Sequence, residues 1–275
     1  MVRYLHASIL ASLVVLSAAP AWADRGPASR PAAAPRAGGK AYVLHLPGIG
    51  GFMGIDRAML AGLEHGRDVE FDVYDWTCDD PGFNALVSYD RNRKQAQIIA
   101  DRLTAAFRAD PVRPIVLTGH SGGTGLAVWA LEMLPDDVHV QTLALLHAAV
   151  SPTYDLSKAL AHVRGTCYAL TSLNDSIVLG AGTKLLGTID GVKTESAGRI
   201  GFTQPPSAEV EQYKKLVQMP YRVEWLKLHN IGDHIGPMSR PFAREVLAPL
   251  LLDGIAPRMA DKLAGAATTR PAAKQ

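Results

Sequence analysis

The sequence predicts an α/β fold, with a mostly parallel sheet of about six strands and helices on both faces. Short apolar runs alternate with segments of helical spacing through residues 40–255. This strand–helix–strand repetition implies parallel strands joined by right-handed crossovers. The length of 275 residues, with 48% hydrophobic and 20% charged residues, suits one large α/β domain.

The individual elements follow from local patterns. Apolar runs that end in turn residues predict strands at 41–48, 69–76, 114–120, 140–150, 166–175 and 221–230. The run at 69–76 alternates apolar and polar residues, as an edge strand does. Helical spacing predicts helices at 56–66, at 89–109, from Gly122 to the residues before Pro135, at 155–163 and at 239–252. Ligands bind such a sheet at the carboxyl ends of its strands.

The N-terminus has the pattern of an export signal. Residues 1–23 combine Arg3, an apolar core and "AWA" ending at Ala23. The apolar run is shorter than the roughly 20 residues of a spanning helix, so we expect cleavage, no stable membrane anchor, and a secreted or periplasmic protein. The Pro- and Ala-rich residues 24–39 predict a disordered linker, and 256–275 a disordered tail.

Charge and cysteine content narrow the partners and the covalent structure. The net charge is +2 and several cations lie near the ends of the chain, so we expect no nucleic-acid partner. Cys78 is expected just past an edge strand, and Cys167 near the start of a strand on the other side of the sheet. Since neighbouring strands lie about 4.8 Å apart, this separation exceeds disulfide reach, and we predict free thiols.

The chemistry-bearing motif is the stretch "PIVLTGHSGGTGLAVWALEML", which begins at Pro114. Gly119 to Gly123 enclose Ser121 where a strand must become a helix, which is the pattern of a nucleophile elbow. The turn projects Oγ above the sheet, a Cβ at either flanking glycine would collide with its neighbours, and the Gly122 N–H can donate to an oxyanion. A glycine-rich turn with a helix-capping serine is the alternative.

A second glycine cluster, "LPGIGGFMG", follows the first predicted strand. This loop can supply another oxyanion donor, and we expect it to be the Ile49 N–H. A dinucleotide-binding loop is the alternative, but its third glycine would fall at Met53, and Gly54 comes one residue late.

A serine nucleophile needs a base, and the base needs an orienting acid. Elbow hydrolases carry these residues in the order serine, acid, histidine. Because His139, His147 and His162 come before the strand that carries the acid, the candidate bases are His229 and His234. We favour His234, because its Gly-rich loop "NIGDHIGPM" can carry the imidazole over the sheet.

Asp175 is the favoured acid because it directly follows a predicted strand. Asp233 and Asp190 are the alternatives. Three further residues receive simpler interpretations: His120 and Trp129 are expected to pack, and His45 either lines the pocket or supports the oxyanion loop.

Taken together, "HLPGIGG", "GHSGG", "SLND" and "GDH" resemble the motifs of the α/β-hydrolase superfamily over residues 41–252. The resemblance implies the α/β-hydrolase fold, with Ser121 as nucleophile, His234 as base and Asp175 as acid. It also implies Ile49 and Gly122 as oxyanion donors. The oxyanion loop departs from the family by having Pro47-Gly48 in place of His-Gly. No large lid domain is expected, although 176–220 could arch over the site.

These observations predict a serine hydrolase that cleaves carboxylic esters of small-molecule acyl substrates, without cofactor or metal. An acyltransferase using the same triad, and a non-catalytic binding protein on the same fold, are the alternatives. The sequence leaves the natural substrate, the acyl chain length and the oligomeric state open.

Overall fold

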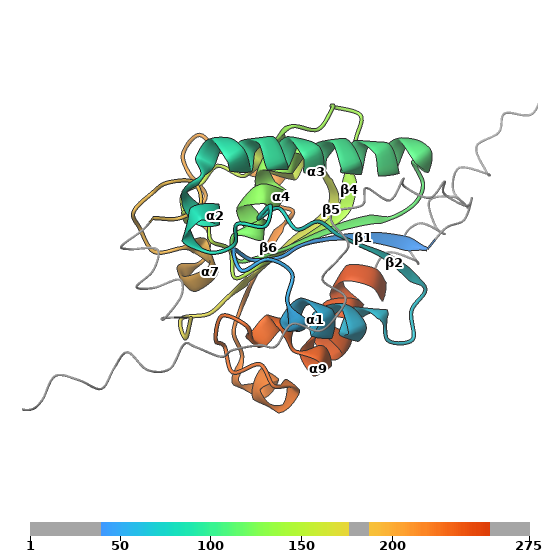
Figure 1. Cartoon of the computed structure of the whole chain (residues 1–275), viewed down its shortest axis with the longest axis vertical. Coiled ribbons are helices and arrows are strands. Elements are labelled where there is room, and N and C mark those ends of the chain that lie inside the picture. The colour runs from blue at the N-terminus through green and yellow to red at the C-terminus, as the bar shows by residue number, and fades with distance from the viewer. Residues whose placement is uncertain (1–39, 176–186, 254–275) are drawn as a thin grey trace, which may run out of the picture. The chain divides into compact units, whose positions relative to one another are not determined.

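The computed structural model describes residues 40–175 and 187–253. Its centre is one sheet of six strands in the order β2-β1-β3-β4-β5-β6, and every neighbouring pair is parallel (Figure 1). The predicted fold class is therefore confirmed. The strands are β1 (Ala41–Leu46), β2 (Val69–Val73), β3 (Ile115–His120), β4 (Val140–Leu146), β5 (Val163–Thr171) and β6 (Leu216–Pro220).

The burial of each strand follows its position in the sheet. The central strands β1, β3 and β4 are apolar on both faces and almost wholly buried, as parallel strands covered by helices must be. The outer strand β2 is only half-buried, which confirms the predicted edge strand. The register pairs Leu46 with Gly119 and His120 with Leu146, so the carboxyl ends of three central strands meet at one level.

Helices cover both faces of the sheet (Figure 1). One apolar cluster joins one sheet face to α2, α3, α4 and α5. A second joins the opposite face to α1, α9 and the closing turns. These helices are α1 (Gly54–Glu64), α2 (Phe83–Val87), α3 (Tyr89–Ala109), α4 (Gly123–Glu132), α5 (Ser157–Ala161) and α9 (Arg240–Phe242). The chain continues as π-helical turns at Ala243–Leu247 and Pro249–Asp253. In a regular α-helix, the Pro249 ring would collide with the Glu245 carbonyl four residues earlier, so the α-helical pattern is interrupted here.

The predicted strand at 221–230 is wrong. Those residues contain a 3₁₀ helix, η2 (Val223–Leu228), and the sixth strand lies just before it. Val223 and Leu226 are exposed, so the apolar residues that suggested a buried strand do not share a buried face. The strand β6 was missed because it is short, half-exposed and ends in Pro220, which an edge strand tolerates. Short helices α7 (Ala197–Ile200), α8 (Val210–Tyr213) and η3 (Gly236–Met238) complete the described chain.

Both cysteines are free, as predicted. Cys78 follows the edge strand β2, whereas Cys167 is buried in β5, with β1, β3 and β4 between the two strands.

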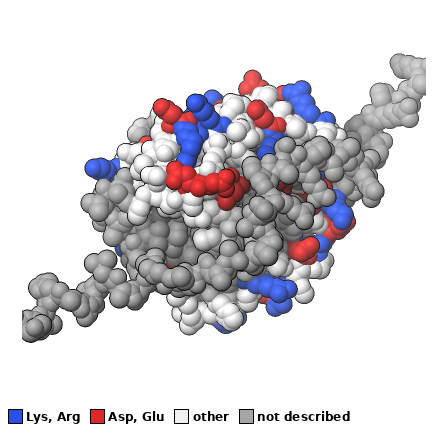
Figure 2. Space-filling model, viewed as in Figure 1, with Lys and Arg blue, Asp and Glu red and all other residues white. Residues whose placement is uncertain are grey.

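Other predictions fall outside the described residues. These are the signal segment 1–23, the linker 24–39, the tail 256–275 and part of the possible cover at 176–220. In the segments that the structure describes, no helix combines the length and apolar character needed to cross a bilayer. On the face shown in Figure 2, cationic and anionic side chains are interspersed.

Gly62 tests the packing of α1 against the closing helix. A Cβ at Gly62 would lie 2.5 Å from the Arg240 carbonyl oxygen and 2.7 Å from the Ala243 Cβ. We expect Gly62→Ala to lower the free energy of unfolding by about 1–3 kcal/mol, although alanine favours helix by about 1 kcal/mol. Urea unfolding measures this. Gly54→Ala is the matched control on the same helix, because nothing lies within 4 Å of its Cβ position. Equal stability of the two variants would contradict the packing argument.

Candidate active site

Ser121 occupies a strained turn between β3 and α4. Its φ of +53° is in the left-handed region that residues with a Cβ rarely adopt. The Ser121 N–H donates to the Leu146 carbonyl at 3.0 Å, and its carbonyl accepts from the Thr124 hydroxyl at 2.5 Å. These two hydrogen bonds therefore keep Ser121 in its strained conformation, as a nucleophile elbow requires.

The flanking glycines are required by close backbone contacts, as predicted. A Cβ at Gly119 would lie 2.7 Å from the Gly123 carbonyl oxygen. A Cβ at Gly123 would lie 2.4 Å from the carbonyl oxygens of Leu46 and Pro47. The start of α4 thus packs directly against the end of β1, which brings the two glycine clusters together.

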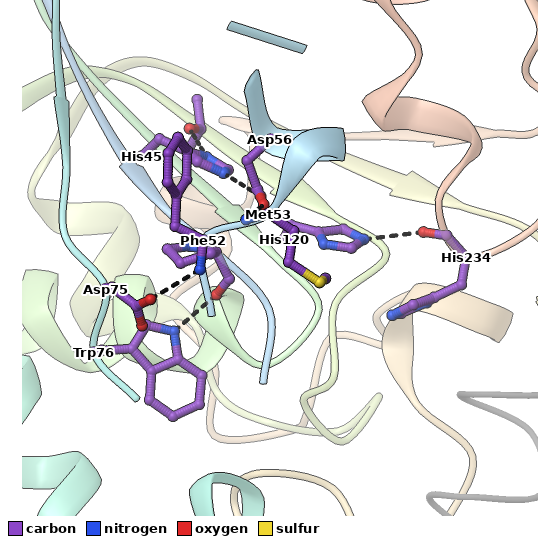
Figure 3. A network of polar contacts seen from close by, with 10 residues as sticks. His45, Phe52, Met53, Asp56, Asp75, Trp76, His120 and His234 are labelled. Atoms are coloured by element: carbon purple, nitrogen blue, oxygen red, sulfur yellow. Dashed lines mark hydrogen bonds and ion pairs between the residues drawn. The ribbon is translucent and has the colours of Figure 1, made fainter. Parts of the chain in front are cut away.

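The loop after β1 is fixed by the segment that follows β2 (Figure 3). The Trp76 Nε1–H donates to the Pro47 carbonyl at 2.7 Å, and the Phe52 N–H donates to the Asp75 carboxylate at 2.8 Å. The Gly82 N–H donates to the Ile49 carbonyl at 2.6 Å. These contacts hold the loop rigidly beside Ser121.

The two predicted oxyanion residues lie side by side. A Cβ at Gly122 would lie 2.7 Å from Ile49 Cγ2, and one at Gly48 would lie 3.2 Å from Ser121 Cβ. In the described parts of the chain, neither the Ile49 nor the Gly122 amide donates a hydrogen bond. Both amides are thus available to another acceptor, and their oxyanion role stays a prediction.

The predicted acid and base are in contact. His234 Nδ1 lies 2.8 Å from Asp175 Oδ2, and Asp175 is only 1% exposed. The alternative acid Asp190 instead accepts hydrogen bonds from the Ser151 amide and hydroxyl. The alternative base His229 is exposed and lines a separate cavity of about 230 Å³ with Asp233. The geometry therefore favours Asp175 and His234 over the alternatives.

His234 also lies beside the elbow. Its ring centroid is 4.9 Å from that of His120, the residue before Ser121. Among the described residues, no hydrogen bond joins the Ser121 hydroxyl to the His234 imidazole. The structure thus pairs the predicted acid with the predicted base and brings the base next to the serine turn.

His120 has a role that the sequence did not indicate. Rather than only packing, its Nε2 lies 3.0 Å from the His234 carbonyl oxygen (Figure 3). A carbonyl can only accept, so Nε2 carries the proton and donates. Burial, and then repulsion from His234, lower the pKa of His120 below its ordinary value. A neutral His120 thus anchors the backbone of the loop that carries the predicted base.

His147 is the second site residue that sequence reasoning missed. It directly follows β4, its φ is +50°, and its Nδ1 lies 3.0 Å from Asp175 Oδ2. Its position in the chain argued against a role as base but did not bear on contact with the acid. The strand order could have indicated this contact, because β4 lies between β3, which precedes Ser121, and β5, which precedes Asp175.

The environment of Asp175 keeps it ionised. Burial alone would raise the pKa of Asp175, but the close contacts of its carboxylate with the His147 and His234 rings lower that pKa well below its usual range. Burial lowers the pKa of His147, and Asp175 only partly offsets this effect. The pair is therefore an ionised carboxylate beside a neutral His147 ring near neutral pH.

A second buried histidine–aspartate pair joins β1 to the start of α1 (Figure 3). His45 Nε2 lies 3.0 Å from Asp56 Oδ1, and His45 Nδ1 lies 2.8 Å from the Thr118 hydroxyl. The other Asp56 oxygen accepts the Met53 N–H at 2.7 Å. Of the two roles considered for His45, these contacts favour support of the loop between β1 and α1.

Side chains that could bind a metal ion come together at the predicted acid and base. Within the described ranges, the one group of three potential ligands is His147, Asp175 and His234, with ligand atoms within 4.8 Å of one another. The 2.8 Å contact between His234 and Asp175 has the length of a charge-assisted N–H···O bond. A shared proton explains this contact, so we assign no metal here.

Comparison with known proteins places these observations in context. No protein-family model and no curated protein matches the sequence. Several solved structures do match. One is Aspergillus fumigatus lipase B, at 11% identity and a TM-score of 0.49, covering 77% of this chain and 52% of the lipase. This chain therefore spans about half of that protein.

Two other matches are shorter proteins. The Xanthomonas campestris protein named as a putative hydrolase of the α/β superfamily matches at 17% identity and a TM-score of 0.43, covering 76% of this chain and 99% of that one. Dienelactone hydrolase from Anabaena variabilis matches at 18% identity and a TM-score of 0.41, covering 78% and 84%.

The buried His120 makes stability depend on pH. Because its pKa is lowered on folding, it adds stability above its ordinary value of 6.5, and that stability is lost as pH falls below 6.5. We expect His120→Gln to flatten the loss on acidification by up to about 1.4 kcal/mol per pH unit, because glutamine does not titrate. The Nε2 of the introduced glutamine can still donate to the His234 carbonyl.

Urea unfolding at a series of pH values measures this change. His120→Leu is the control: it should show the same flattening but lower stability at neutral pH, because it lacks the donor. An acid dependence as steep in His120→Gln as in the unaltered protein would contradict the assignment.

Proposed function

We propose that the protein is a serine hydrolase of acyl compounds, and that its substrates are carboxylic esters. The observation that supports this most is the buried, ionised Asp175 bonded to the His234 imidazole, whose loop is anchored to His120 beside the strained Ser121. A serine in a strained elbow with this acid–base pair alongside has the parts of an acyl-transfer site.

The pairing of His234 with Asp175 sets the tautomer of the base. An ionised carboxylate only accepts, so His234 Nδ1 carries the proton and Nε2 keeps its lone pair. The Ser121 hydroxyl attacks the ester carbonyl carbon while Nε2 accepts its proton. Such contacts are often long before substrate binds and shorten in the reacting complex. Asp175 then stabilises the imidazolium that forms.

The remaining steps follow from the groups around the elbow. The Ile49 and Gly122 amides donate to the oxyanion of the tetrahedral intermediate. The His234 imidazolium returns its proton to the leaving alcohol as the C–O bond breaks, which leaves an acyl-Ser121 ester. Water attacks this ester with His234 again as base, and the products are a carboxylic acid and the free serine.

Substitution of Ser121 tests the proposal. We expect Ser121→Ala to lower the rate on p-nitrophenyl esters at least about 1000-fold and to abolish labelling by a fluorophosphonate probe. Esters of increasing acyl length identify the preferred substrate. Ser207→Ala is the control, because this exposed serine contacts only Asp155 at the surface, and it should keep both properties.

Two results would sink the assignment. The first is labelling that persists in Ser121→Ala. The second is a folded wild-type protein, checked by cooperative unfolding, that neither turns over any ester of the series nor reacts with the probe; a binding protein would behave this way.

A further inference from the structure

Two buried polar atoms in the site have no hydrogen-bond partner among the described residues, and they belong to neighbouring side chains. They are His147 Nδ1 and Asp175 Oδ1. His147 Nδ1 lies 3.0 Å from the other carboxylate oxygen, Oδ2, but is not aligned for a hydrogen bond with it. Oδ2 is already bonded to His234. Buried polar atoms are seldom left unpaired, so this pair calls for an explanation.

The chemistry of the carboxylate decides where the His147 proton sits. An ionised carboxylate has only lone pairs to offer. Without a proton on Nδ1, two buried atoms with only lone pairs would lie 3.0 Å apart, so we place the proton on Nδ1 of His147. A small rotation that aligns this N–H with the carboxylate would pair the buried nitrogen.

We propose that His147 is a positioning residue that holds the Asp175 carboxylate in place for His234, an inference that rests on the proposed function. His147 is 2% exposed and follows β4, whereas His234 is carried by a loop. The carboxylate thus has one donor fixed to the sheet and one donor on the loop that performs the chemistry.

This division solves a problem that a single imidazole leaves open. A buried carboxylate without a partner is costly, and it regains a proton or moves toward water. If the His234 ring turns toward Ser121, its bond to Asp175 weakens for that moment. His147 keeps a donor on the carboxylate throughout, so Asp175 stays ionised and in register for the returning imidazolium.

Other charged groups near His147 act in the same region. They are Asp175, His234, Asp233 and, through its own ring, His120. Asp233 attracts and the two other rings repel a proton on His147. Burial is the largest effect and lowers the pKa of His147, which favours the neutral ring.

Two substitutions separate the donor from the rest of the side chain. Asparagine places its Nδ2 one bond from Cγ, as histidine places Nδ1, and it tolerates the left-handed φ of +50°. Leucine has the same branching without a donor. We expect His147→Leu to lower kcat about 10- to 100-fold with little change in KM, the effect of losing one bond to a charged group. His147→Asn should restore most of the rate.

The pH profile gives a readout that loss of packing would not move. Without the His147 donor, Asp175 accepts more strongly from His234 and favours its protonated ring. The acidic limb of the kcat profile should therefore move to higher pH by about 0.5–1 unit in His147→Leu. It should stay in place in His147→Asn. An unmoved limb in the leucine variant, or an asparagine variant no better than leucine, overturns the proposal.

Nitrogen-15 NMR of histidine-labelled wild-type protein tests the same idea without activity. We expect the Nδ1–H tautomer for both His147 and His234, and the Nε2–H tautomer for His147 would overturn the proposal even if the leucine variant does not fold. Failure of the proposed function is separately visible: the wild-type protein would show no turnover or probe labelling, whatever the tautomer of His147.

Discussion

The backbone turn at Ser121 is the constraint on which the rest of the site depends. A residue with a side chain is held in left-handed geometry between the end of β3 and the start of α4, at a cost of order 1–3 kcal/mol. The turn persists because the Leu146 carbonyl and the Thr124 hydroxyl bind its backbone. It also requires glycine at Gly123, where the helix start presses on the end of β1.

The parallel sheet turns sequence distance into proximity. The strands β3, β4 and β5 are adjacent in that order, and Ser121, His147 and Asp175 follow them. Three residues far apart in the chain therefore lie together at the carboxyl ends of the strands. His234 is the exception, because it reaches this end of the sheet on a loop, which His120 and Asn174 bind through the carbonyls of His234 and Ile231. The proposed acid is thus placed by the sheet, whereas the proposed base is placed by side chains that bind the backbone of its loop.

Much of this could be predicted from local pattern. The helix at 89–109 has its predicted bounds, and the serine turn follows from glycine spacing between an apolar run and a helical one. The contacts of His120 and His147 were not predicted, because hydrophobic periodicity locates neither the backbone carbonyl that His120 binds nor the strand order that brings His147 to Asp175. The strand β6 was missed for a related reason: an edge strand buries little, so its apolar pattern is weak.

Among the described residues, strained backbone conformations gather beyond the carboxyl ends of the strands. The residues other than glycine with positive φ are Cys78, Asp79, Ser121, His147 and His229. The first two follow β2, and Ser121 and His147 directly follow β3 and β4, so all four lie beyond the carboxyl ends of strands. Left-handed geometry at His147 has a cost similar to that at Ser121, and asparagine or glycine would reduce it. The left-handed turn at His147 places its ring 3.0 Å from Asp175, so the strained backbone and the buried carboxylate meet at the same place, and the cost of the turn accompanies a contact with the proposed acid.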